Sequence, residues 1–80
     1  MSNTPHTLQD EFPGEGQKIT ELKVGNPHFA KLLLDYDEVN DKVHRAETRL
    51  DLITEEEEVG LRRQRSRLKD EIARMLRAAA

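Results

Sequence analysis

Two long series of apolar residues, spaced alternately three and four positions apart, constrain this sequence more than any other feature. The first series consists of Phe29, Leu32, Tyr36, Val39, Val43, Ala46, Leu50 and Ile53. The second consists of Leu61, Leu68, Ile72, Met75 and Ala79, and Arg65 interrupts it. This spacing places each series in a narrow stripe along one side of an α-helix, as in helices that pack as coiled coils. The sequence therefore predicts two long helices, each of which packs its stripe against another helix.

Signals for the start of a helix precede both series. Asn26 is a good N-cap, and Pro27 suits the first helical position, where its missing N–H costs nothing. Thr54 and Glu57 form a capping box. We therefore predict long helices over about residues 27–52 and 54–78. One continuous helix from Pro27 to residue 77 remains an alternative, because neither Gly nor Pro enforces a turn between the two series.

The first quarter of the chain has weaker signals. Residues 1–11 are mostly polar and are predicted to form a flexible tail. Pro13 suits the start of a helix and Gly25 suits its end, so we expect a short helix over about residues 13–24. Gly14 and Gly16 weaken its first turn. Residues 12–80 then form a single helical domain.

The two stripes match in one antiparallel register if the chain folds back near Ile53–Glu55. The matched pairs are Phe29 with Ala79, Leu32 with Met75, Tyr36 with Ile72, Val39 with Leu68, Val43 with Arg65, and Ala46 with Leu61. The same register brings Glu47 near Arg62 and Arg49 near Glu57, which are pairs of opposite charge. The fold prediction is therefore all-α: a short N-terminal helix followed by a long antiparallel helical hairpin.

A wider apolar patch is expected where the hairpin is open. In the same register Leu33 meets Leu76, and Leu34 lies beside them. The patch would accept either the short helix, through Phe12, Ile19 and Leu22, or a second copy of the chain. Two helices alone bury little apolar surface, so dimerisation into a four-helix bundle is favoured. Leu33, Leu34 and Leu76 are therefore the candidate interaction residues.

Catalytic and metal sites are not expected. The chain has no cysteine, which excludes thiolate catalysis and cysteine-based zinc sites. Its histidines, His6, His28 and His44, lack the spacing of metal ligands, and neither Ser2 nor Ser66 lies in a nucleophile motif. We predict a protein that is not an enzyme, with no cofactor, no metal and no small-molecule partner. Since no segment has the length of a membrane span or the core of a signal peptide, we expect a cytoplasmic location.

A basic segment is the main candidate for a second kind of function. The residues RRQRSRLK span positions 62–69, and a basic helix face can follow the phosphates of a nucleic acid. The candidate contact residues are Arg62, Arg63, Arg67 and Lys69. The net charge of −3 and the lack of interleaved aromatic residues make nucleic-acid binding the alternative. The leading prediction is a non-enzymatic interaction module that acts by self-association, with a dimer favoured, or by binding an unidentified protein partner.

Two residues on the stripes, Tyr36 and Arg65, carry polar groups whose surroundings can be predicted. The Tyr36 hydroxyl needs a partner or an exit to water. Arg65 can pack its stem in the stripe while its head group stays polar, and such a residue can fix the register of a helix pair.

Several segments resemble one family. These are EFP at 11–13, ITELK at 19–23, NPHFAKLLLDYDEVNDKVHRAE at 26–47 and RRQRSRLKDEIARMLR at 62–77. They are similar to the YdcH-like family of small bacterial proteins. The resemblance implies a helical coiled-coil protein of unknown function without established catalytic residues. The chain departs from the family at Gly14-Glu15-Gly16, which puts the stability of the first helix in doubt.

Overall fold

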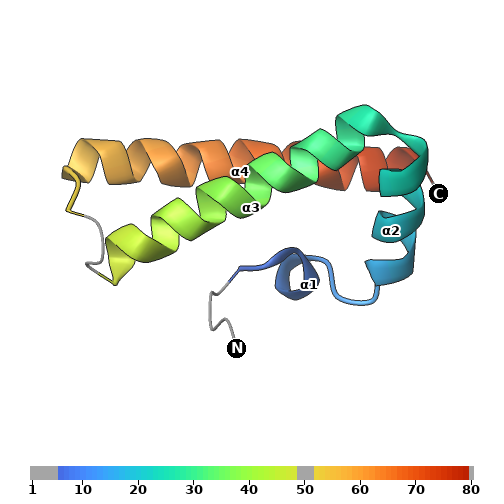
Figure 1. Cartoon of the computed structure of the whole chain (residues 1–80), viewed down its shortest axis with the longest axis horizontal. Helices are drawn as coiled ribbons and strands as arrows, with labels where there is room; N and C mark the ends of the chain where they lie inside the picture. Colours follow the sequence, from blue (N-terminus) through green and yellow to red (C-terminus); the bar gives the residue numbers. More distant parts are fainter. Residues whose placement is uncertain (1–5, 49–51, 80) are drawn as a thin grey trace.

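The computed structural model describes residues 6–48 and 52–79 as a helical structure. The described residues form α1 (Leu8–Glu11), α2 (Gly16–Gly25), α3 (Pro27–Glu47) and α4 (Glu55–Ala78), with no strand among them. The long helices α3 and α4 pack against each other and run in opposite directions (Figure 1). The helix α2 contacts both of them where α3 begins and α4 ends. The predicted all-α hairpin is confirmed, and the alternative of one continuous helix is wrong.

Side-chain caps start the two long helices as predicted. The side-chain oxygen of Asn26 accepts a hydrogen bond from the backbone N–H of Phe29 at 3.2 Å, and Pro27 is the first residue of α3. The Thr54 hydroxyl oxygen likewise accepts from the backbone N–H of Glu57 at 3.1 Å. These bonds satisfy N–H groups that have no partner inside the helix.

The end of α3 corrects the predicted boundary. The helix ends at Glu47 and not near residue 52, and Leu52 is not helical. At Thr48 the backbone N–H and the side-chain hydroxyl both donate to the carbonyl of His44, at 3.0 and 2.9 Å. A hydrogen bond from a threonine hydroxyl to the carbonyl four residues earlier slightly destabilises a helix. This bond therefore favours the end of α3 at Thr48. The predicted contact of Arg49 with Glu57 and the stripe position Leu50 lie outside the described residues.

The N-terminal segment differs from the prediction in two ways. The helix α2 begins at Gly16 and not at residue 13, because Gly14 has a φ of +80°, which a right-handed helix does not accommodate. Residues within the predicted tail instead form α1. The Thr7 hydroxyl oxygen caps it by accepting from the backbone N–H of Asp10 at 3.3 Å. The Thr-x-x-Asp pattern at 7–10 is a capping signal, and it starts a helix inside the predicted tail.

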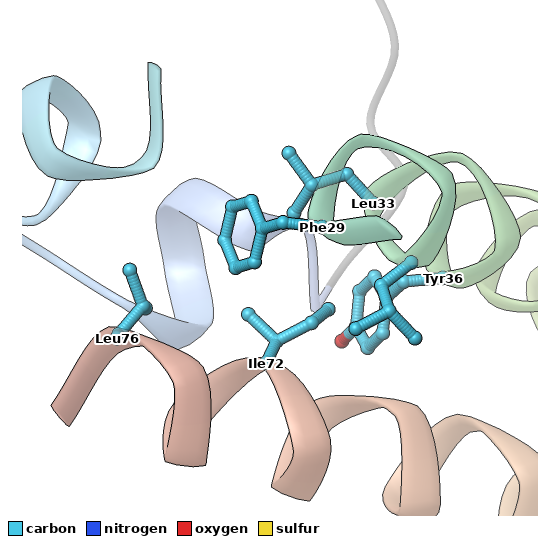
Figure 2. Packing of buried hydrophobic residues seen from close by; sticks show 6 residues of the cluster. Phe29, Leu33, Tyr36, Ile72 and Leu76 are labelled. Atoms are coloured by element: carbon cyan, nitrogen blue, oxygen red, sulfur yellow. The ribbon is translucent and has the colours of Figure 1, made fainter. Parts of the chain in front are cut away.

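One hydrophobic cluster forms the core at the open end of the hairpin, where α3 begins and α4 ends. Its buried members are Phe29, Leu32, Leu33, Tyr36, Ile72 and Leu76. Leu8, Phe12, Ile19, Leu22, Leu68 and Met75 pack against it. Figure 2 shows Phe29 and Tyr36 of α3 pointing toward Ile72 of α4. At the other end, which we call the turn end, the buried residues of α3 are the smaller Val39, Val43 and Ala46.

Candidate interaction surface

The three predicted interaction residues do not share one surface. Leu33 and Leu76 are buried in the core, while Leu34 is 68 % exposed on the outside of α3. Phe12, Ile19 and Leu22 pack against the cluster that contains Leu33 and Leu76. The short helix therefore covers the apolar patch, which was the first of the two occupants expected from the sequence. The role of the three residues in binding a partner stays a prediction, and only Leu34 is accessible without moving α2.

A polar network ties the N-terminal segment to the hairpin. The Tyr36 hydroxyl donates to the backbone carbonyl of His6 at 2.7 Å, which supplies the partner that its burial requires. Burial raises the pKa of Tyr36 to about 12. The carboxylate of Glu11 lies 2.8 Å from His6 Nδ1 and 3.1 Å from Lys69 Nζ. The hydrogen bond with His6, helped by Lys69, lowers the pKa of Glu11. The network therefore holds α1 against α3 and α4.

Polar side chains also cross between α3 and α4 toward the turn end. Arg65 Nη1 donates to Asn40 Oδ1 at 3.1 Å, and Asn40 is the buried polar residue of the described chain. This contact agrees with a packed Arg65 stem and a paired head group. Arg62 Nη2 lies 3.1 Å from Glu47 Oε2, which confirms the predicted ion pair.

The candidate basic residues do not form one free surface. Arg62 pairs with Glu47 and with Glu58, each at 3.1 Å, and Lys69 pairs with Glu11. Arg63 and Arg67 are exposed, and the described part of the chain offers them no ion pair. Two of the four cations are thus engaged by the chain's own carboxylates.

Exposed apolar residues gather at the turn end. Leu52 is 88 % exposed and Val59 is 44 % exposed. A hollow of about 580 Å³ is lined by Lys42, Ile53, Glu57, Gly60, Leu61 and Gln64. A second, of about 420 Å³, is lined by Glu55, Glu56, Val59, Gly60 and Arg63. Leu52 lines a third hollow, and Ile53 connects it to the first one, because Ile53 lines both. We call Leu52, Ile53, Val59, Gly60 and Leu61 the turn-end surface.

The stripes give no signal for this surface, because Val59 lies outside the second stripe and Gly60 has no side chain that could belong to one. The usable signal was their adjacency: an apolar residue beside a glycine, two positions before the stripe begins at Leu61. In the structure Gly60 joins the two hollows, since it lines both.

The described residues hold no group of three or more His, Cys, Asp or Glu side chains placed to bind a metal ion. No helix among them combines the length and the apolar character that crossing a membrane requires.

Comparison with known proteins identifies one family. A family model described as "Protein of unknown function (DUF465)" matches residues 29–76, which include most of α3 and α4. No curated protein and no solved structure matches the chain.

Proposed function

The chain belongs to the YdcH-like family of proteins of unknown function (DUF465), and we propose that it is a non-enzymatic protein-interaction module. It acts first by self-association, through the turn-end surface. The observation that supports this most is the exposure of Leu52 and Val59 at the end of the hairpin that no further helix of the described chain covers.

The distribution of burial explains why the turn end is the favoured surface. At the open end the chain covers its own apolar residues with α1 and α2, so that Leu33 and Leu76 are already buried. At the turn end the apolar side chains of Leu52 and Val59 face water. Full burial of one such side chain from full exposure contributes about 1.5–3 kcal/mol. Leu52 keeps most of this exposure and Val59 less than half of it, so a contact that covers both in each copy supports a weak association.

Nucleic-acid contact is the less favoured function. A phosphate-binding surface needs cations that are free to approach the backbone. Arg62 and Lys69 are held by carboxylates of the same chain. Of the four candidate cations, Arg63 and Arg67 remain exposed without an ion pair in the described residues, and the net charge of −3 does not attract a polyanion.

The oligomeric state tests the proposal. We would measure the mass of the protein by sedimentation equilibrium over a wide range of concentrations. The wild type should form a dimer, and Leu52→Asp or Val59→Asp should shift it to the monomer. Val24→Asp is the matched control, because Val24 is 83 % exposed on α2, away from the turn end.

Two results would count against the proposal. A wild-type protein that stays monomeric at every concentration would remove self-association. A dimer that dissociates in Leu34→Asp and not in Val59→Asp would move the contact to the outside of α3.

A further inference from the structure

On the outer side of the first half of α4, an acidic and a basic side chain lie beside a small apolar patch. Glu56 and Arg63 line the same hollow as Val59 and Gly60. Building on the proposed self-association, we infer that a second copy of the chain lays its own α4 antiparallel across this side. In that arrangement Glu56 of each copy pairs with Arg63 of the other.

The helical phase places these charges together and away from the core. Glu56 and Arg63 are seven positions apart in one helix, so their directions differ by only about 20°. Both are exposed, whereas Ile72 and Leu76 mark the side of α4 that packs in the core. The pair therefore lies on a side of α4 that α3 leaves open.

An antiparallel contact with a twofold axis brings the two charges face to face. The axis passes between Val59 and Gly60. Glu56 lies three positions before Val59, and Arg63 lies three positions after Gly60, so both are equally distant from the axis. A twofold contact makes each interaction twice, so the dimer contains two Glu56–Arg63 pairs.

Gly60 allows the two helices to approach each other closely at the axis. A Cβ atom built on Gly60 would meet no atom within 4 Å, so the helix surface is low and empty at this point. In the antiparallel arrangement Gly60 lies beside Gly60 of the second copy, and Val59 lies beside Val59 of the second copy. The half-exposed valines then cover each other.

The charge pattern favours a second copy over an unrelated helix. The acid precedes the axis and the base follows it, so the surface is complementary to itself only when the two helices are antiparallel. A parallel pairing would oppose Glu56 to Glu56 and Arg63 to Arg63. Within the described residues neither side chain makes an ion pair, so both are available to a second copy.

Charge reversal and its compensation test this arrangement. Sedimentation equilibrium would give the dimer dissociation constant for Glu56→Arg, for Arg63→Glu and for the double variant. Each single substitution turns two attractions into two repulsions and should weaken the dimer about tenfold. The double variant exchanges the charges and should return the constant to within about threefold of wild type. Lys31→Glu, which makes the same charge change as Arg63→Glu on the exposed side of α3, should leave the constant unchanged.

The outcomes separate this inference from the proposed function. A monomeric wild type would remove both. A dimer that ignores both single substitutions, or a double variant as weak as the single ones, would overturn the Glu56–Arg63 pairing while leaving self-association intact. Recovery in the double variant also excludes unfolding as the cause, because that variant carries both substitutions.

Discussion

The two ends of the hairpin bury their apolar residues in different ways. At the open end, side chains from all four helices of the described chain meet in one cluster around Phe29, Tyr36 and Ile72. At the turn end α3 and α4 pack through smaller residues, of which Val43 is fully buried, while Val59 stays half-exposed. The short N-terminal helices therefore complete the core at one end of the hairpin and leave the other end as a surface.

This difference separates the end of the hairpin that is expected to stabilise the fold from the end that we propose for self-association. A hairpin of two helices has little apolar surface to bury, so the closed cluster at the open end is expected to supply most of the stability. The turn end is expected to contribute less to the fold, because Leu52 and Val59 there remain exposed. Substitutions at the two ends should then have different consequences, which the following experiments measure.

The largest effect is expected for Phe29→Ala at the open end. Phe29 is fully buried, and its removal leaves a cavity lined by residues from several helices. The free energy of unfolding, from urea denaturation, should fall by about 3–5 kcal/mol. Leu34→Ala on the same helix should change it by less than about 0.5 kcal/mol, because Leu34 is exposed. Equal losses in the two variants would contradict a core centred on the open end.

A smaller effect is expected for Asn40→Ala, between the two ends. The substitution removes the acceptor of Arg65 from a buried position of α3. Loss of this partner should lower the free energy of unfolding by about 1–3 kcal/mol. Replacing both residues, Asn40→Leu with Arg65→Leu, should cost less than Asn40→Ala alone, since an apolar pair needs no hydrogen bond. The double variant would also show whether the polar pair fixes the oligomeric state, by a change in its sedimentation.

Features that depend on the residue types at a helix start, or on the periodic stripes, could be predicted from the sequence. The caps at Asn26 and Thr54 follow from the residue types at each helix start, and the Glu47–Arg62 pair follows from the matched stripes. The helix α1 was missed because it has four residues, and its position depends on Tyr36, which is 30 residues from His6. Such a contact cannot be derived from local spacing.

The candidate surface was harder to predict than the fold. The stripes indicate that Leu33 and Leu76 form a patch, but not whether the chain or a partner covers it. The structure shows the patch covered by Ile19 and Leu22 of α2, among other residues. The turn-end surface depends on Val59 and Gly60, which are outside the stripes. Periodicity finds residues that pack within a hairpin, and it gives no signal for a contact on its outer side.

The ionisation of Tyr36 tests whether the open end is closed. The unfolded chain releases the phenol proton near pH 10, whereas the folded protein keeps it until about pH 12. Between these values the unfolded chain binds fewer protons, so the free energy of unfolding should fall as the pH rises. Tyr36→Phe should remove this part of the pH dependence and cost about 1 kcal/mol at neutral pH, through the lost hydrogen bond to His6. Tyr36 is the single tyrosine, so the absorbance of tyrosinate reports on it directly. Titration near pH 10 would mean that α1 does not cover this position.

The smallest effect is expected at the turn end, for Gly60→Ala, and it should have the opposite sign. Gly60 lies inside α4, where alanine is favoured over glycine by about 0.5–1 kcal/mol. A Cβ atom at this position meets no other atom within 4 Å, so the monomer accommodates it without strain. Urea denaturation at low protein concentration should therefore show a more stable monomer, while the added methyl group at the axis should weaken the dimer in sedimentation. A monomer destabilised by Gly60→Ala would contradict an open surface here. A gain in stability together with weaker association would show that the turn end keeps a glycine for contact between copies, at some cost to the fold.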